Sequence, residues 1–308
     1  MNSSKIKGLD VSALTLGTVQ LGMNYGINNT NGKPSENEGL SILKIAERGG
    51  VTMLDTSNDY GESEKVIGRY MRENLDTPLG ICTKFRIDAV KAGEVKRALY
   101  ESAEGSLKNL SVSKLPIFMS HIESDYLTHP NELANGLAEL KRDGLISLAG
   151  MSVSKKDDLD VIIDSGVFDA IQLPMNIFDN AVIRNGTLKR AAEKGIIIFV
   201  RSVYLQGLFF KDPDTLEGTK FASGADLLRK IHRYANELNL TVAELATAFI
   251  RDTEGVSSLV VGCETADQLK SNLAAINAPA IPQPIYENML DDFSNVDSFL
   301  ISPWEWAK

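Results

Sequence analysis

The sequence predicts a (β/α)₈ (TIM) barrel, and three observations lead to this α/β fold class. Eight short apolar segments alternate with amphipathic segments along nearly the whole chain. The apolar segments show little regular alternation of polar and apolar residues, as is typical of parallel strands covered on both faces. No G-x-G-x-x-G motif follows any of them, which favours a closed barrel over a doubly wound sheet.

The predicted strands are short runs rich in aliphatic side chains. They cover residues 14–18, 51–55, 79–84, 115–121, 146–152, 169–173, 196–202 and 257–262. The helices predicted from apolar residues at helical spacing cover residues 36–48, 62–74, 91–109, 131–143, 155–165, 180–194, 241–252 and 265–275. Ser63, Asn131 and Thr265 stand where helix N-caps are expected.

Two segments are additions to the eight strand–helix units of a minimal barrel. The loop over 206–224 is long, and a further helix over 225–238 follows it. Long loops on a compact scaffold often act as lids or ligand clamps. A last helix and a tail with two tryptophans extend from about residue 284 to residue 308. Because no linker or internal repeat divides the chain, residues 1–308 are predicted to form one domain.

The composition narrows the classes of function. The 308 residues carry a net charge of -9 without a basic cluster, which argues against nucleic acid as a partner. The two cysteines, Cys82 and Cys263, form no metal-binding motif, so we expect no metal and no structural disulfide. Neither a signal peptide nor a membrane-spanning run of about 20 apolar residues is visible. We therefore expect a cytoplasmic protein without a membrane partner, either a monomer or a small homo-oligomer.

Four polar residues stand at or just after the ends of three successive strands. Asp55 ends the second strand and Tyr60 follows it, while Lys84 and His121 end the third and fourth strands. Catalytic groups of α/β barrels gather at these carboxyl ends. A neighbouring ammonium lowers the pKa of a phenol, and a carboxylate keeps that ammonium charged. The set therefore predicts a reductase site in which Tyr60 transfers a proton to a carbonyl oxygen that His121 binds.

Each of these residues also has a purely structural interpretation. Asp55 could cap a helix and Tyr60 could be a surface aromatic residue. Lys84 could be a solvated lysine and His121 a hydrogen-bonded histidine at a strand end. Their joint placement on neighbouring strand ends is what favours a site.

The segment LDTSNDYGESEKVIG (54–68) resembles the signature stretch of the aldo-keto reductases. Further similar stretches follow in the family's order, at residues 14–18, 136–154, 171–179, 205–209 and 260–273. The catalytic Asp, Tyr, Lys and His of the family fall on Asp55, Tyr60, Lys84 and His121. The resemblance implies a barrel that binds NADP(H) or NAD(H) and reduces a small aldehyde or ketone to the alcohol.

The resemblance also implies which residues bind the cofactor. They are Thr18 after the first strand, Ser152 and Gln172 at the carboxamide, Arg201 at the nicotinamide ring, Leu205, Gln206 and Gly207 along the pyrophosphate, and Gly262, Glu264, Thr265, Gln268 and Asn272 at the adenosine end. This chain departs from the family at Val153, where Asn is usual, and at Arg201, where an aromatic ring often stacks. Arg201 could stack instead, reach an anionic group of the substrate, or pair with a carboxylate.

The choice between the two cofactors depends on the start of the last barrel helix. Glu264 and Gln268 stand where many NADP-preferring members carry Lys or Arg. A carboxylate repels a phosphate but accepts hydrogen bonds from ribose hydroxyl groups. If Glu264 faced solvent, Thr265 and Lys270 could bind the phosphate, so both cofactors stay open.

The substrate is less determined. Tyr25, Phe85, Tyr204, Trp304 and Trp306 are candidate walls of the pocket. Resemblance of the stretches MNYGI and VRSVYLQGLFF to a bacterial branch linked to sugar metabolism suggests a sugar-like carbonyl compound. The alternative to an enzyme is a cofactor-binding regulatory or scaffold protein of the same fold with little or no turnover. A barrel hydrolase or lyase would need metal ligands or paired carboxylates at the strand ends, and the sequence shows neither set.

Overall fold

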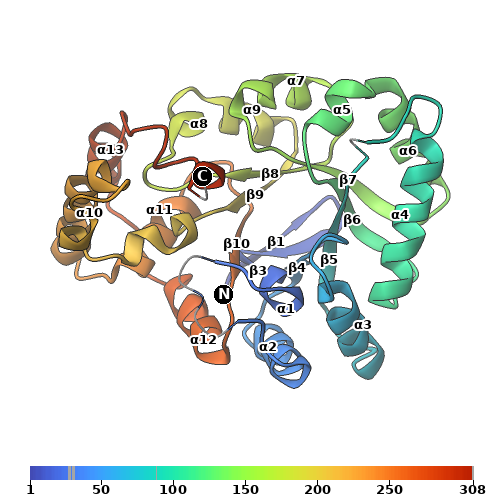
Figure 1. Cartoon of the computed structure of the whole chain (residues 1–308), viewed down its shortest axis with the longest axis horizontal. Helices are drawn as coiled ribbons and strands as arrows, with labels where there is room; N and C mark the ends of the chain where they lie inside the picture. The colour runs from blue at the N-terminus through green and yellow to red at the C-terminus, as the bar shows by residue number, and fades with distance from the viewer. Residues whose placement is uncertain (27–28, 30–31, 88, 307–308) are drawn as a thin grey trace.

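The computed structural model describes residues 1–26, 29, 32–87 and 89–306. The barrel strands are β3 (Leu14–Gly17), β4 (Met53–Asp55), β5 (Gly80–Phe85), β6 (Leu115–Ser120), β7 (Ile146–Ser152), β8 (Ala170–Pro174), β9 (Ile197–Arg201) and β10 (Ser258–Gly262). All neighbours are parallel, and β10 pairs with both β9 and β3 to close the ring (Figure 1). The predicted barrel is confirmed.

An outer layer of helices surrounds the strands. Its main members are α2 (Glu36–Arg48), α3 (Ser63–Glu73), α4 (Val95–Leu110), α6 (Pro130–Arg142), α7 (Leu159–Asp164), α9 (Thr187–Glu193), α11 (Val242–Arg251) and α12 (Ala266–Ala275). The predicted helix over 91–109 begins later, at Val95, and the predicted helix over 180–194 is divided by Gly186, whose φ is +76°. In the part of the chain that the structure describes, no helix has the length and hydropathy needed to cross a bilayer.

Helix capping agrees with the sequence in part. Thr265 caps α12 as predicted, because its side chain accepts a hydrogen bond from the Gln268 N–H. Ser63 is instead the first residue of α3, and its hydroxyl donates to the Thr18 carbonyl. Asn131 lies inside the first turn of α6, which begins at Pro130. Proline replaces a cap there because its fixed φ suits the first helical position.

Several further elements cover the barrel ends and edges. They are the short helices α1 (Val19–Gly22), α5 (Ser124–Thr128) and α8 (Ala181–Arg184), the 3₁₀ segments η1 (Lys156–Asp158), η2 (Leu205–Phe210), η3 (Pro213–Leu216), η4 (Ala222–Gly224) and η5 (Pro303–Glu305), and the helices α10 (Ala225–Glu237) and α13 (Gln283–Asp292). The long loop before α10 is therefore built from 3₁₀ turns. The C-terminal helix of the prediction corresponds to α13.

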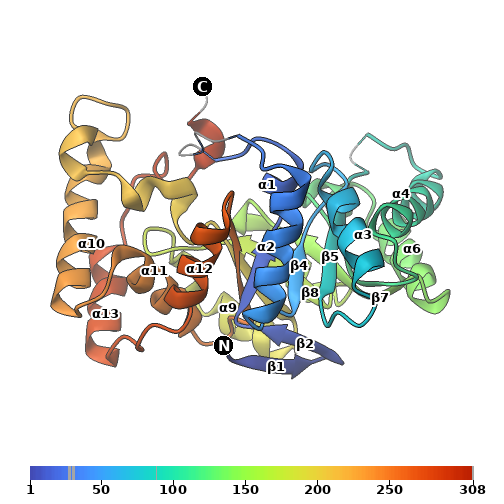
Figure 2. The same ribbon diagram turned by 90° about the horizontal axis from the view of Figure 1, so that it is seen from below.

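A hairpin that the sequence did not predict closes one end of the barrel. It consists of β1 (Ser3–Ile6) and β2 (Leu9–Ser12), and it lies across the amino ends of the strands (Figure 2). Lys7 and Gly8 form the turn with φ of 48° and 83°, which matches the twist of a tight hairpin. Val11 is only 1% exposed and belongs to the apolar cluster inside the barrel. The opposite end, where the strands finish, stays open for a site.

Two glycines test how closely the outer helices pack. A Cβ at buried Gly68 in α3 would lie 1.9 Å from the Asn109 carbonyl oxygen in α4, whereas a Cβ at exposed Gly105 in α4 would meet nothing within 4 Å. We expect Gly68→Ala to lower the free energy of unfolding by about 1–3 kcal/mol through overpacking. Gly105→Ala should raise it by roughly 0.5–1 kcal/mol through helix propensity. Urea unfolding of both variants measures this, and equal effects would contradict the packing.

Candidate active site

The alternation of side chains along the strands places polar groups at the open end of the barrel. Met53, Cys82, Ala170 and Phe199 belong to the apolar cluster inside the barrel. Because side chains of a strand alternate between its two faces, the residue two positions later also points inward. Those later residues are Asp55, Lys84, Gln172 and Arg201. The interior therefore changes from apolar to polar at the carboxyl ends of four strands.

An ion pair occupies the centre of this polar layer. Lys84 Nζ lies 2.6 Å from Asp55 Oδ1, and the two side chains are 0% and 6% exposed. Lys84 also donates to the Thr56 carbonyl oxygen at 3.3 Å, and Gln172 Nε2 donates to Asp55 Oδ1 at 2.7 Å. Burial is the largest single influence and disfavours the charged ammonium, but the attraction and hydrogen bond of Asp55, together with Tyr60 and Cys82, move the pKa of Lys84 above its usual range. Lys84 is thus a permanent buried cation.

Tyr60 lies on the loop after β4, above this ion pair. Its ring centre is 5.3 Å from Lys84 Nζ, and its carbonyl oxygen accepts the Ser63 N–H. A Cβ on Gly22 would lie 1.7 Å from the Tyr60 carbonyl oxygen, so only glycine in α1 permits this position of the loop. Burial raises the pKa of the Tyr60 phenol, and Lys84 opposes that rise. The net direction is upward, contrary to the lowered pKa expected from Lys84 alone, so the phenol keeps its proton at neutral pH.

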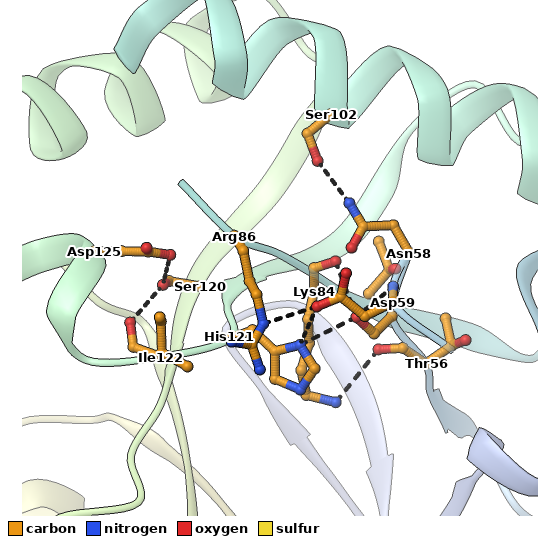
Figure 3. Close-up of polar contacts among 12 residues, drawn as sticks. Thr56, Asn58, Asp59, Lys84, Arg86, Ser102, Ser120, His121, Ile122 and Asp125 are labelled. Atoms are coloured by element: carbon orange, nitrogen blue, oxygen red, sulfur yellow. Dashed lines mark hydrogen bonds and ion pairs between the residues drawn. The ribbon is translucent and has the colours of Figure 1, made fainter. Parts of the chain in front are cut away.

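His121 follows β6 and is held by acceptors on one ring nitrogen. Its Nδ1 lies 3.2 Å from Asp59 Oδ2 and 3.2 Å from Ser57 Oγ, and Arg86 Nε lies 2.8 Å from the same Asp59 oxygen (Figure 3). Burial and the nearby cations Lys84, Arg86 and Arg201 lower the pKa of His121 to about 3. The Asp59 carboxylate does not offset this shift, because Arg86 already neutralises it. The imidazole is neutral at pH 7.

The contact with Asp59 favours one tautomer of the neutral His121 ring. The Asp59 carboxylate can only accept a hydrogen bond, so it favours a proton on Nδ1 and leaves Nε2 as an acceptor. Ser57 Oγ lies at the same distance from Nδ1 and can donate to it, which is compatible with a proton on Nε2. The first tautomer suits a hydroxyl group as the partner of Nε2, and the second suits the carbonyl oxygen that the sequence predicts.

A cavity of about 700 Å³ opens beside this polar layer. Most residues predicted for the site line it: Thr18, Tyr25, Asp55, Tyr60, Gln172, Arg201, Tyr204, Gln206, Gly207, Gly262, Glu264, Thr265, Gln268 and Asn272. They come from the carboxyl ends of β4, β8, β9 and β10, from the loops after β3, β4, β9 and β10, and from the first turns of α12. The cavity therefore extends from the buried ion pair to the start of a helix.

The start of α12 gives one part of the cavity an acidic lining. Glu264 and Asp267 both line it there, and Glu264 Oε2 accepts a hydrogen bond of 2.8 Å from Gln268 Nε2. Lys270 pairs with Asp267 at 2.8 Å but is not one of the residues that line the cavity. Arg201 is the basic residue of the lining in the described part of the chain. The two charge signs are thus separated within one cavity.

Unusual backbone conformations gather in the loop after β9. Ser202, Leu205 and Gln206 have φ of 64°, 49° and 51°, and Gly207 has φ of 93°. Such left-handed conformations are costly for residues with a side chain and persist where the surrounding structure enforces them. They turn Gln206 and Gly207 toward the cavity while Leu205 packs into the core at 1% exposure.

Comparison with known proteins identifies the family. The model of the Aldo/keto reductase family matches residues 13–287. The chain belongs to the aldo/keto reductase family. It is similar to an NADH-specific methylglyoxal reductase of Escherichia coli K12, with 25% identity over 272 residues that cover 77% of this chain and 82% of the relative. It is also similar to an L-glyceraldehyde 3-phosphate reductase of the same strain, with 24% identity over 302 residues and 86% of both chains covered.

Solved aldo/keto reductase structures share the fold. One from Bacillus halodurans in its holo form has a TM-score of 0.77 at 18% identity, with 94% of this chain and 96% of that chain covered. A glycerol dehydrogenase from Gluconobacter oxydans has a TM-score of 0.76 at 19% identity, with 96% and 97% covered. Together with the family match, this makes the protein an NAD(P)-dependent oxidoreductase.

The cavity of this aldo/keto reductase fits a dinucleotide cofactor. Gln20 lines the cavity, and its Oε1 is buried without a hydrogen-bond partner among the described residues. Buried polar atoms normally have partners, so this oxygen indicates a ligand that donates an N–H or O–H there. Hydroxyl and amide side chains of Thr265, Gln268 and Asn272 at the start of α12 add further partners for phosphates and sugar hydroxyls.

Some predicted residues lie elsewhere. Lys84 is buried beneath the cavity, and His121, Ser152 and Leu205 do not line it. Phe85 was expected in the pocket wall but points outward, because it follows inward-facing Lys84, and its ring packs 4.4 Å from that of Phe118.

The tryptophan tail also differs from the expectation. Trp306 is 5% exposed, donates from Nε1 to the Phe299 carbonyl oxygen and packs against Phe221. Trp304 is 52% exposed, and neither tryptophan lines the cavity. The predicted pocket walls that remain are Tyr25 and Tyr204.

The sequence analysis missed several residues that line the cavity. Val19, Gln20, Gly26, Asn29, Ser202, Val203, Phe210, Ala243, Asp267 and Ser271 are among them. Gln20 and Asp267 lie two residues after Thr18 and Thr265, so the turns of α1 and α12 could have indicated them. Phe210 is aromatic and 50% exposed. Its position in the long loop over 206–224, which was expected to act as a lid or clamp, could have indicated it.

The pKa of His121 predicts how stability depends on pH. Between pH 3 and pH 6.5, His121 is neutral in the native state but protonated in the unfolded state, so the native state binds fewer protons. The free energy of unfolding therefore decreases as pH falls below about 6.5. From pH 7 to pH 5 we expect wild type to lose about 2 kcal/mol relative to His121→Gln in unfolding experiments. NMR titration of His121 gives the direct measurement. A midpoint above pH 6.5 would instead show that Asp59 holds an imidazolium.

Proposed function

We propose that this aldo/keto reductase reduces the carbonyl group of a small aldehyde or ketone and that Tyr60 donates the proton. The protonated phenol of Tyr60, placed in the cavity above the Lys84–Asp55 pair, carries this proposal. The raised pKa keeps the proton on the phenol until an acceptor binds. A bound nicotinamide would supply the hydride, which no side chain can supply.

Lys84 and Asp55 support the proton transfer without giving up protons themselves. As the phenol loses its proton, the charge that develops on its oxygen is attracted by the permanent cation of Lys84. Asp55 holds that cation in place at 2.6 Å and is itself held by Gln172. The pair therefore acts on the charged product of the proton transfer more than on the resting phenol.

We assign His121 to a hydroxyl group of the substrate or product. Its ring does not line the cavity itself, but the ring centre lies 5.6 Å from that of Tyr60, which does. His121 Nε2 is the acceptor in the tautomer that Asp59 favours. A hydroxyl group next to the carbonyl carbon, or the alcohol formed by reduction, can donate to it. This assignment supports a hydroxylated, sugar-like carbonyl compound, and two similar proteins are named as reductases of methylglyoxal and L-glyceraldehyde 3-phosphate.

Replacement of Tyr60 tests the proton donor. We expect Tyr60→Phe to lower kcat by roughly 100- to 10,000-fold, because a positioned acid contributes about that much. The affinity for NADH should change little, since the phenyl ring remains. Tyr25→Phe, which removes another hydroxyl group from the same cavity, is the matched control and should cost much less. Steady-state kinetics and NADH titration measure both, and near-normal turnover of Tyr60→Phe would contradict the mechanism.

We further propose that NADH is the preferred cofactor. The start of α12 presents Glu264 and Asp267 to the cavity, and Lys270 is already paired with Asp267. Lys270 offsets the charge of Asp267, but among the described residues no cation pairs with Glu264. The Glu264 carboxylate therefore repels the 2′-phosphate of NADPH, whereas it can accept hydrogen bonds from the ribose hydroxyls of NADH. One similar protein is named as an NADH-specific reductase.

Replacement of Glu264 tests this preference. Glu264→Arg removes the repulsion and adds a guanidinium group that can bind the phosphate. We therefore expect the Kd for NADPH divided by the Kd for NADH to fall by about tenfold or more. Glu264→Gln removes only the charge and should have an intermediate effect. Fluorescence titration with both cofactors measures the ratio. Tighter binding of NADPH than NADH by wild type would contradict the proposal.

We also place the protein in a reducing compartment, the cytoplasm. Cys82 and Cys263 are both buried and unpaired with each other. Burial raises the pKa of each thiol, that of Cys263 to about 12. Buried thiols of this kind pack as small apolar groups and do not depend on oxidation.

A further inference from the structure

We infer that the substrate carries an anionic group, a carboxylate or a phosphate, and that the guanidinium of Arg201 binds it. The inference deepens the proposed reductase function and rests on it. Arg201 is the last residue of β9, points inward by strand alternation and lines the same cavity as Tyr60 and Gln172. A charged group at this position faces the space in which a carbonyl compound has to bind.

Arg201 differs from its neighbouring cations because it has no carboxylate partner. Lys84 pairs with Asp55, Arg86 with Asp59, and Lys156 with Asp179. Among the described residues no carboxylate oxygen lies within 4.0 Å of the Arg201 nitrogens. A partly buried cation without a counter-charge is costly, so a bound anion would remove an existing penalty as well as add contacts.

The guanidinium is also held in a fixed orientation. Arg201 Nη2 donates to Ser154 Oγ at 2.9 Å and to the Val153 carbonyl oxygen at 3.4 Å, both beyond the end of β7. These contacts occupy one of the three guanidinium nitrogens. In the described part of the chain, no hydrogen bond joins Nε or Nη1 to another residue. A planar guanidinium group with unused N–H donors can form two parallel hydrogen bonds to the oxygens of a carboxylate or phosphate.

The direction of the side chain distinguishes a substrate anion from the cofactor phosphates. In the barrel, β9 lies between β10 and β8, and β7 follows β8. Arg201 reaches from β9 across β8 to the end of β7, away from β10 and the α12 start that follows it. Its charge also lowers the pKa of both Tyr60 and His121, although burial is the larger influence on each. The cation therefore serves the proton-transfer side of the cavity.

Matched pairs of aldehydes test the inference on the wild-type protein. Glyceraldehyde 3-phosphate against glyceraldehyde probes a phosphate, and 4-carboxybenzaldehyde against 4-formylbenzamide probes a carboxylate of nearly equal shape. With NADH or NADPH as donor, we expect kcat/KM for the anionic member of at least one pair to exceed that of its neutral partner by about 10- to 100-fold. The pair with the larger ratio identifies the kind of anion.

Variants of Arg201 then test the residue. Arg201→Met should lower the anionic-to-neutral ratio of kcat/KM at least tenfold, mainly through KM, and Arg201→Lys should restore part of it because the charge remains without the fork. Arg69→Met is the control, because it removes an arginine that is already paired with Glu36 and Glu73 and does not line the cavity. We expect Arg69→Met to leave the ratio within about twofold.

A binding measurement provides a readout without turnover. The Tm of the protein should rise more with 4-carbamoylbenzoate than with neutral terephthalamide, and Arg201→Met should abolish the difference. Turnover of neutral and anionic aldehydes at equal rates, or an equal loss on both in Arg201→Met, would overturn the inference and leave the reductase function intact. Absence of NADH or NADPH oxidation with all four aldehydes would overturn the proposed function and this inference together.

Discussion

The buried ion pair between Lys84 and Asp55 is the interaction on which the site depends. Two charges that are almost fully removed from water cost several kcal/mol each unless their geometry and hydrogen bonds compensate. Here the barrel supplies the compensation, because Gln172 donates to Asp55 and the Thr56 carbonyl accepts from Lys84. Loss of Lys84 or Asp55 would leave the other charge buried without a partner, so stability and catalysis share these two residues.

The charged groups near Arg201 are paired with opposite charges, whereas Arg201 itself, within the described part of the chain, is not. Arg86, Asp59 and the ring of His121 form one grouping, in which Asp59 pairs with Arg86 and contacts Nδ1 while burial and the nearby cations keep the imidazole uncharged. On the other side of the cavity, Glu264 and Asp267 supply negative charge at the start of α12. A ligand that carries both a carbonyl group and an anion therefore has one preferred direction in the cavity, because only one side attracts its charge.

A large part of the site could be predicted because, in a barrel, a residue's position along its strand decides at which end of the barrel it lies. Residues that end successive parallel strands must lie together at one edge of the ring, so the ends of β4 and β5 sufficed to bring Asp55 and Lys84 together. The same rule of alternation excludes Phe85, since a residue next to an inward-facing lysine faces outward. The pocket wall predicted from Phe85 is therefore wrong.

By itself, the sequence determined the fold class, the strand ends and about half of the residues that line the cavity. Short-range patterns carry that information, because strand and helix periods repeat within a few residues. Only the tertiary structure decided the raised pKa of Tyr60, the contact of His121 with Asp59, the fixed orientation of Arg201 and the closing hairpin β1–β2. Each of these depends on burial or on partners distant in the chain: Asp59 and Arg86 for His121, Ser154 for Arg201, and Met53 and Phe199 for the cluster that Val11 joins.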